Sequence, residues 1–303
     1  MTGSSTRGRN LALTSVRRLI DDVPELVRQH GRRLLPGLYV PVLIAGLLGI
    51  FLQQDQMRWA LDESDSEGPL MAITWVPAVV ASLTVYLCAF YAALVATTEA
   101  VMGRTPSMAR AWLFVARPAG LLAIVTISIL GLFSLILCLL PALYVLPRFA
   151  FVLPAMFDEK LSPLAASRRS RELIYFTPGG LFKSGWALTL VVQTVGALVA
   201  YAVTFIVQMP FSIVQMFLLL RDMPAGGTLS TEAMIAPLWL QIPMVLLSSL
   251  GTSLAWLYWC FATAALFREL RRRKEGDDLQ EAIDALTGMD DTSHEHHEET
   301  PLT

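Results

Sequence analysis

The chain has 303 residues, and its 23 Lys and Arg nearly balance its 25 Asp and Glu, which gives a formal net charge of −2. Hydrophobic residues make up 54% of the sequence and charged residues only 16%, whereas soluble domains typically carry about 25% charged residues. This composition excludes an ordinary soluble domain and predicts a protein that folds in a membrane.

The first 33 residues form a basic segment in which apolar residues recur at helical spacing. Val16, Leu19, Val23 and Val27 share one face of a helix, and Arg and Asp residues occupy the other face. This pattern predicts an amphipathic helix before the first membrane span. We therefore take residues 1–33 as a cytoplasmic N-terminal segment.

Six apolar runs follow this segment. A helix needs about 20 predominantly apolar residues to cross the hydrocarbon core of a membrane. The runs cover residues 34–53, 71–97, 119–140, 142–157, 181–207 and 235–267. The sequence therefore predicts an all-α, polytopic integral membrane protein with about six transmembrane helices, and a membrane domain that spans residues 34–267.

The positions of Lys and Arg predict the orientation in the membrane. Residues 1–33, 98–117, 158–183 and 268–303, which six crossings place on one side, hold 20 of the 23 Lys and Arg. Short basic loops stay cytoplasmic, so we expect both termini in the cytoplasm. The same distribution requires an even number of crossings between 98–117 and 158–183, and the short run 142–157 therefore counts as a returning span.

Amphipathic helices are also expected before the third and fifth spans. Thr105 and Ser162 are predicted N-caps, and a proline follows each of them at the first helical position. With the N-terminal segment, this gives three units of one cytoplasmic helix and two spans. Alternatively, any basic loop between spans tends to look amphipathic, and the similarity of the three units then has no further meaning.

After residue 267 the chain becomes basic and then acidic. We expect residues 268–303 to form a disordered or marginally helical cytoplasmic tail, in which "EGDDLQEAIDALTG" is able to form one short helix. The tail contains His294, His296 and His297, which are expected to bind metal ions only weakly because a tetrahedral site needs a folded frame. The sequence predicts no metal site and no cofactor.

The fourth run combines three prolines with a permanent charge. Pro141, Pro147 and Pro154 are expected to kink the span and to free backbone carbonyls. Arg148 lies among them, although an arginine at the bilayer centre costs roughly 2.5–3.5 kcal/mol. Two interpretations are open. In the first, the guanidinium stabilises the kinked span by bonding the freed carbonyls or by reaching headgroups, Asp55 or Asp222. In the second, it binds a ligand or a lipid headgroup.

Three carboxylates are expected near the inner face of the membrane. Glu99 follows the second span, and Asp158 and Glu159 follow the fourth. Together they are able to bind a cation or relay protons. The alternative is that they form ion pairs with nearby arginines such as Arg104 or Arg168, or lie in the headgroup region.

The basic residues beside the spans fit the anionic lipids of the inner leaflet, because each contributes about 1 kcal/mol of attraction. They lack interleaved exposed aromatic residues, so no nucleic-acid partner is predicted. The sequence contains no P-loop, GxGxxG, HExxH or GxSxG motif. We therefore predict a non-enzymatic protein, with a lipid-modifying activity left open. Membrane-protein partners and a homo-oligomer remain open as well.

Residues 140–176 resemble the membrane domain of some glycerophosphoryl diester phosphodiesterases and of related stand-alone six-span bacterial membrane proteins. The matching residues are Pro141, Arg148, Pro154, Glu159, Ala165, Arg169, Ser170 and Leu173. The chain departs from that pattern after Leu173, where "IYFTPGG" replaces a Lys-Gly pair followed by Trp. The phosphodiesterase activity of the fused members belongs to a separate soluble domain, so the resemblance implies a fold rather than an activity.

The candidate lipid- or ligand-binding residues are thus Arg148, Glu99, Glu159, Arg169 and Ser170. The sequence favours an integral protein of a bacterial cytoplasmic membrane that binds lipid or organises a membrane complex. The alternative is a permease or transporter subunit in which kinked helices form a pathway near Arg148.

Overall fold

The computed structural model describes residues 5–61, 68–137, 139–175, 184–221 and 237–294, and the side chains of residues 21–52, 76–133, 144–175, 184–221, 237–276 and 279. The secondary structure of these residues is helical, without a β-strand. In chain order the helices are α1 (Ser5–Leu61), α2 (Gly68–Val101), α3 (Met108–Val115), α4 (Pro118–Leu137), α5 (Leu139–Phe149), α6 (Val152–Asp158), α7 (Pro163–Tyr175), α8 (Gly185–Arg221) and α9 (Leu238–His294).

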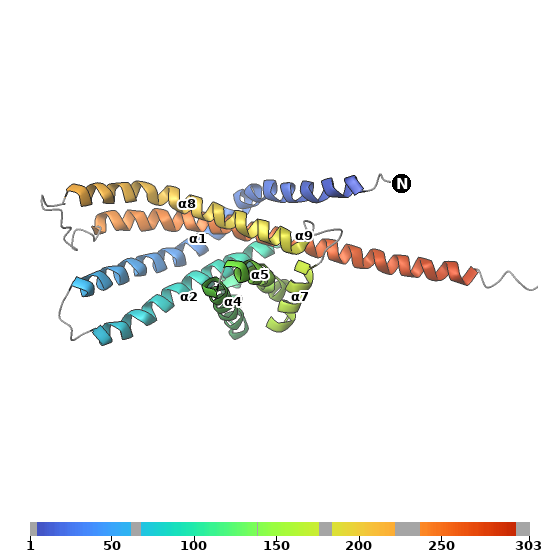
Figure 1. The fold of residues 1–303 in the computed structure, drawn as a ribbon, viewed down its shortest axis with the longest axis horizontal. Helices are drawn as coiled ribbons and strands as arrows, with labels where there is room; N and C mark the ends of the chain where they lie inside the picture. Colours follow the sequence, from blue (N-terminus) through green and yellow to red (C-terminus); the bar gives the residue numbers. More distant parts are fainter. Residues whose placement is uncertain (1–4, 62–67, 138, 176–183, 222–236, 295–303) are drawn as a thin grey trace, which may run out of the picture.

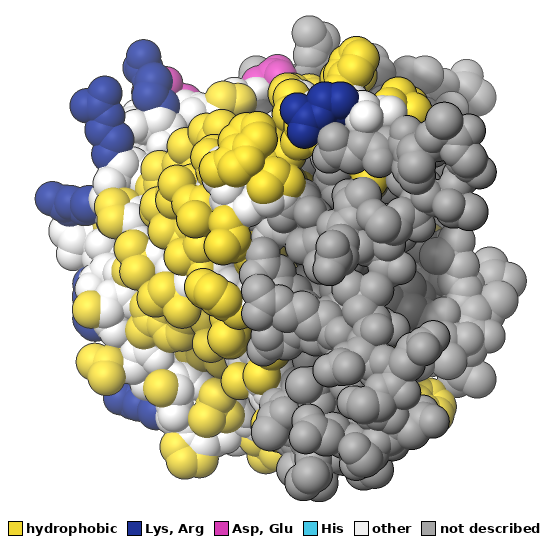
Figure 2. Space-filling model, turned by 90° about the vertical axis from the view of Figure 1, so that its left-hand side faces the viewer, with side chains coloured by type: hydrophobic (Ala, Val, Ile, Leu, Met, Phe, Trp, Pro, Cys, Tyr) yellow, Lys and Arg dark blue, Asp and Glu magenta, His cyan; other side chains and the backbone are white. Residues whose placement is uncertain are grey.

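Within the described residues, four helices are long and apolar enough to cross a membrane. These candidate spans are Asp21–Leu52 in α1, Val76–Val101 in α2, Gly185–Arg221 in α8 and Leu238–Gly276 in α9. They run lengthwise through the molecule (Figure 1). Many large hydrophobic side chains on them are exposed, among them Ile44, Leu83, Phe205 and Leu247, and Figure 2 shows such side chains covering much of the described part of one face. This surface fits a multi-pass membrane protein.

The third and fourth predicted spans differ from this pattern. Helices α3 and α4 meet at a bend of 77°, and α4 gives a fifth candidate span only if the bent pair is counted as one. The predicted span 142–157 is divided between α5 and α6, with a turn at Ala150 and Phe151. Helices α4 and α5 form a hairpin in which Gly131 lies against Leu146. Figure 1 shows this hairpin set across the long helices rather than along them.

The predicted boundaries of the membrane domain fall inside continuous helices. Helix α1 joins the N-terminal segment to the first span and contains Pro24, Pro36 and Pro41. Helix α9 continues past residue 267 to His294, where the sequence predicted a tail that is disordered or helical only over a short segment. Ion pairs one turn apart support its charged section: Arg271–Glu275 at 2.7 Å and Glu269–Arg273 at 3.0 Å.

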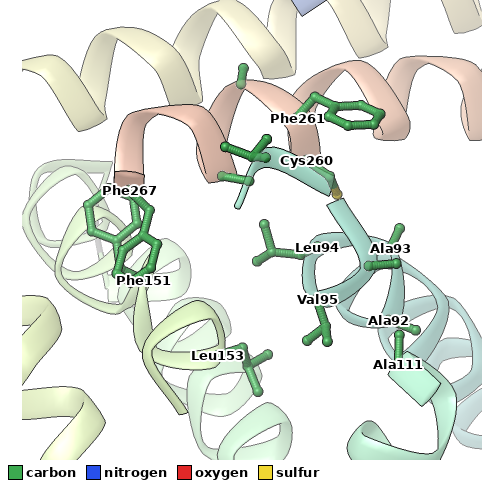
Figure 3. Packing of buried hydrophobic residues seen from close by; sticks show 14 of the residues in the cluster. Ala92, Ala93, Leu94, Val95, Ala111, Phe151, Leu153, Cys260, Phe261 and Phe267 are labelled. Atoms are coloured by element: carbon green, nitrogen blue, oxygen red, sulfur yellow. The ribbon is translucent and has the colours of Figure 1, made fainter. Parts of the chain in front are cut away.

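The core lies around the second half of α2, in which residues 92–100 are all buried. A helix that is buried on all sides needs small residues where its neighbours approach, and Ala89, Ala92, Ala93 and Ala96 meet this need. Figure 3 shows α3, α6 and α9 contributing Ala111, Leu153 and Phe261 around this segment. The rings of Phe151 and Phe267 pack together with centroids 5.7 Å apart, which joins the α5–α6 turn to α9.

Candidate functional site at the charged end

The ends of several helices bring most described charged side chains together. We call this region the charged end; it comprises residues 97–117, 158–175 and 268–276. It contains the end of α2, helices α3 and α7, the end of α6 and the section of α9 that follows Phe267. Ion pairs at the charged end join segments that lie more than 100 positions apart in the sequence. Asp158 and Arg271 form one such pair.

Glu99 is buried, with 1% of its surface exposed, and both carboxylate oxygens are engaged. Oε2 accepts a hydrogen bond from the backbone N–H of Ser107 at 2.8 Å, and Oε1 pairs with Arg110 at 3.3 Å. Ser107, rather than the predicted Thr105, is the N-cap of α3, because its backbone is extended and its hydroxyl accepts from the N–H of Arg110. Glu99 therefore anchors the start of α3 to the end of α2.

Asp158 joins three parts of the charged end. Its side chain is only 4% exposed, and Oδ1 lies 2.9 Å from Arg104 in an ion pair whose geometry is not that of a hydrogen bond. Oδ2 accepts a short hydrogen bond from Arg271 of α9. Because Arg104 follows α2 and Asp158 ends α6, the α4–α5 hairpin leaves the charged end and returns to it.

Glu159 and Arg169 form the next ion pair, with Arg169 Nε 3.1 Å from Oε2 of Glu159. The guanidinium of Arg169 also contacts Glu275 of α9 at 3.3 Å. Lys274 adds a second link between α9 and α7 by pairing with Glu172 at 3.2 Å. These pairs hold α7 against α9, and they bring two of the predicted site residues into direct contact.

The predicted carboxylate group is thus neutralised by arginines. Glu99, Asp158 and Glu159 each pair with at least one arginine, which favours the ion-pair interpretation over a cation site. The partner of Glu99 is Arg110, not Arg104 or Arg168. Among the described residues, no three His, Cys, Asp or Glu side chains are grouped to hold a metal ion, and the side chains of the histidine tail lie outside them.

Ser170 holds the turn between α5 and α6. Its buried hydroxyl donates to the carbonyl of Arg148 at 2.8 Å and accepts from the N–H of Phe151 at 3.3 Å. Pro147 and Pro154 flank this turn, and neither has an N–H to continue the helical hydrogen bonds. The predicted kink is therefore a break, and a serine of α7 rather than a guanidinium bonds the backbone groups at this break. Pro141 lies in α5, and its side chain is not among those described.

Arg148 has no carboxylate within 4 Å in the described part of the chain. Its guanidinium carbon lies 6.0 Å from the centre of the Phe149 ring, and its buried Nε has no hydrogen-bond partner. The side chains of the two predicted partners, Asp55 and Asp222, lie outside the described residues. The Ser170 bond places the backbone of Arg148 beside α7, at the charged end.

Tyr175 of α7 lies close to this arginine. Burial raises the pKa of Tyr175, and a hydrogen bond with Tyr144 raises it further, whereas the nearby charges of Arg148 and Arg171 lower it. The guanidinium carbon of Arg171 lies 5.9 Å from the centre of the Tyr175 ring. The positive charges of Arg148 of α5 and Arg171 of α7 therefore both lie close to Tyr175, the last residue of α7.

A groove of about 550 Å³ lies next to Arg148, between α8 and α5, over α2 and α9. Its lining is mostly apolar and aromatic and includes Phe90, Leu146, Pro147, Phe149, Leu198 and Trp259. Three polar side chains in the groove bond one another: Trp259 Nε1 donates to Gln193 at 2.6 Å, and Gln193 Nε2 donates to Thr263 at 3.3 Å.

Several exposed arginines at or near the charged end have no carboxylate within 4 Å among the described residues. They are Arg32, Arg33, Arg117, Arg168 and Arg171. The acidic side chains of this end, by contrast, are all ion-paired: Glu99, Asp158, Glu159, Glu172, Glu269 and Glu275. The surface of the charged end therefore carries an excess of positive charge.

Sequence reasoning missed the partners in this network. Arg110 and Arg271 enter the sequence prediction only as basic residues that indicate orientation, and Glu275 only as part of the tail. The available signal was the continued i,i+4 pairing of Glu269–Arg273 and Arg271–Glu275 beyond the last span. A comparison with known protein families, curated proteins and solved structures finds no match for this chain, so the resemblance to the phosphodiesterase membrane domain stays a prediction.

Proposed function

We propose that the protein is a non-enzymatic integral protein of the bacterial cytoplasmic membrane that binds anionic lipid headgroups at its charged end. The observation that carries this proposal is the group of exposed arginines without carboxylate partners, beside acidic side chains that are already neutralised. Such arginines are free to bind phosphate groups, which arginine contacts through paired N–H donors. A role in organising a membrane complex rests on the same lipid attachment.

The magnitude of the attraction supports this role. Each basic residue near an anionic leaflet contributes about 1 kcal/mol, so four or five arginines contribute roughly 4–5 kcal/mol. The attraction decreases beyond a Debye length of about 8–10 Å at physiological salt. The proposed association is therefore sensitive to salt and to the fraction of anionic lipid.

In this proposal the charged end faces the cytoplasm and the chain enters the membrane as six segments, of which α4 and α5–α6 are the third and fourth. Two observations support this topology. The Arg104–Asp158 ion pair brings the two ends of the hairpin together. Figure 1 shows the N-terminal end of α1 and the C-terminal part of α9 extending towards the same end of the molecule, which agrees with the distribution of Lys and Arg.

The test compares spin-labelled phosphatidylglycerol and phosphatidylcholine in nanodiscs that contain the protein. We expect a preference for phosphatidylglycerol that falls with added salt and is reduced at least threefold when Arg32, Arg33, Arg117 and Arg168 are all replaced by Gln. The control is Arg28→Gln, since Glu25 already pairs with this arginine at 3.0 Å. Equal association of both lipids with the unaltered protein would overturn the proposal, as would an unchanged preference in the fourfold variant.

A transporter subunit is the second candidate, favoured by the groove beside the broken α5–α6 segment. This function requires the groove to hold water. The introduced thiol of an Ala197→Cys variant, on the groove wall, should then react with a membrane-impermeant thiol reagent. An unreactive thiol would exclude a water-filled pathway along this groove.

A further inference from the structure

We infer that the groove between α8 and α5 holds one acyl chain of an anionic phospholipid, whose headgroup is bound by Arg148 and Arg171. The inference rests on the proposed function for the side of the membrane and the charge of the lipid. It goes further by assigning a defined site for a single lipid. This site uses neither the four arginines replaced in the test above nor the ion-pair network.

The length of the groove fits one leaflet. Its wall on α8 runs from Leu190 to Tyr201, which is about 16 Å at 1.5 Å per residue. The hydrocarbon core of a bilayer is about 30 Å thick, so one leaflet accounts for about 15 Å. The wall begins about one turn after the start of α8 at the charged end. A chain in the groove therefore extends from the headgroup region to the middle of the membrane.

The chemistry of the lining favours hydrocarbon over a polar ligand. Gln193, Trp259 and Thr263 satisfy one another, and none of the groove-lining residues has a buried side-chain nitrogen or oxygen without a hydrogen-bond partner. A polar solute would gain few hydrogen bonds in such a groove and would lose its hydration. Leu146, Leu198 and Tyr201 are exposed at the rim, so the groove is open towards the lipid phase.

The charge beside the groove selects the headgroup. Arg148 lies between Pro147 and Phe149, which both line the groove, and its Nε is buried without a partner. Arg171 is exposed on the adjacent helix α7, and both arginines act on Tyr175. Two guanidinium groups without carboxylate partners, one next to the groove lining and the other close to the same tyrosine, are complementary to a phosphate attached to an acyl chain.

The backbone geometry keeps Arg148 in place. Ser170 bonds the carbonyl of Arg148 and the N–H of Phe151, so α7 determines where the α5–α6 turn lies. The same helix carries Arg171. Helix α7 therefore fixes the backbone of Arg148 relative to that of Arg171. The apolar residues of α5 that line the groove come directly before the turn.

The experiment uses nanodiscs of equal parts phosphatidylglycerol and phosphatidylcholine, with a trace of one lipid or the other carrying a diazirine in its acyl chain. We expect the phosphatidylglycerol probe to label peptides within 144–158 and 185–221 of the unaltered protein more strongly than the phosphatidylcholine probe does, because bulk lipid reaches the exposed side chains of α8 with either probe. Ala197→Trp fills the groove and should reduce this excess at least tenfold. Ala202→Trp, an equally large change at an exposed position of α8 outside the groove, should leave it unchanged.

Three outcomes would overturn the inference. The first is equal labelling of the Ala197→Trp and Ala202→Trp variants, and the second is the absence of α5 and α8 peptides from the labelled products of the unaltered protein. The peptide map requires no substitution, so it holds even if Ala197→Trp fails to fold. Displacement of the lipid by a second protein copy would appear as protein–protein cross-links through α8 and would also contradict the inference.

A separate arm tests the headgroup. The double variant Arg148→Gln, Arg171→Gln should reduce labelling by phosphatidylglycerol to the level of phosphatidylcholine, while the fourfold variant of the preceding section should label normally. Equal labelling by the two lipids in the unaltered protein would refute the headgroup assignment. The two sets of arginines do not overlap, so the two proposals fail separately. Loss of the general preference for phosphatidylglycerol with intact groove labelling would contradict the proposed function alone. Loss of groove labelling with an intact general preference would contradict this inference alone.

Discussion

Ser170→Ala tests how the broken α5–α6 segment is held in place. The substitution removes one hydroxyl from a fully buried site and leaves two backbone groups without their partner. The carbonyl of Arg148 loses a donor at 2.8 Å, and the N–H of Phe151 loses an acceptor at 3.3 Å. A buried polar group left unsatisfied costs about 1–3 kcal/mol. Because the second bond is long, we expect a total loss of about 2–4 kcal/mol in the free energy of unfolding.

Thermal unfolding in detergent, followed with a thiol-reactive fluorogenic dye, measures this loss. Cys88 and Cys260 are buried, so their thiols react when the protein unfolds. At about 2–4 °C per kcal/mol, Ser170→Ala should lower Tm by roughly 4–16 °C. Ser167→Ala is the control on the same helix, because the side chain of Ser167 makes no hydrogen bond among the described residues, and it should change Tm by less than about 2 °C. Equal Tm values for the two variants would refute the role assigned to Ser170.

Two further substitutions test the packing and the ion-pair network. At Gly196 an added Cβ lies 2.6 Å from the ring of Trp259, so Gly196→Ala should destabilise the protein by about 1–3 kcal/mol. The control is Gly49→Ala, which should be neutral or stabilising because an added Cβ there has nothing within 4 Å. The same thermal assay compares the two variants. Asp158→Asn removes the one carboxylate within 4 Å of Arg104 among the described residues and one of the three around Arg271, which keeps Glu159 and Glu275. It should cost about 1–3 kcal/mol, less than a fully buried pair because both arginines reach water. Glu25→Gln, in an exposed pair, should leave Tm unchanged, and equal effects at both sites would contradict the network.

The apolar runs predicted the long helices because hydrophobic length and the absence of charge are local properties of the sequence. The four candidate spans in α1, α2, α8 and α9 overlap the first, second, fifth and sixth predicted runs. Helix α7 begins at the predicted position, where the backbone carbonyl of Ser162 accepts from the N–H of Ala166. Local signals of this kind do not depend on the rest of the fold.

The arrangement of α4, α5 and α6 was not predictable in the same way. Pro147 and Pro154 indicated a disruption, but its form depends on Ser170, which lies 22 residues after Arg148. The paired state of Glu99 depends on Arg110, whose position follows from the turn that joins α2 to α3 at residues 102–107. The groove requires the relative placement of five helices, α2, α4, α5, α8 and α9. Each of these features is a tertiary contact, and one sequence gives no direct measure of such contacts.

The central claim, that the charged end faces the cytoplasm, is tested most directly by thiol labelling of intact cells. Single cysteines are introduced as Arg168→Cys on α7 and as Leu220→Cys near the opposite end of α8, both at exposed positions, in a protein in which the native cysteines are replaced by Ser or Ala. With a membrane-impermeant reagent, we expect labelling of Leu220→Cys in intact cells and of Arg168→Cys only after the cells are opened. Labelling of Arg168→Cys in intact cells would contradict the account.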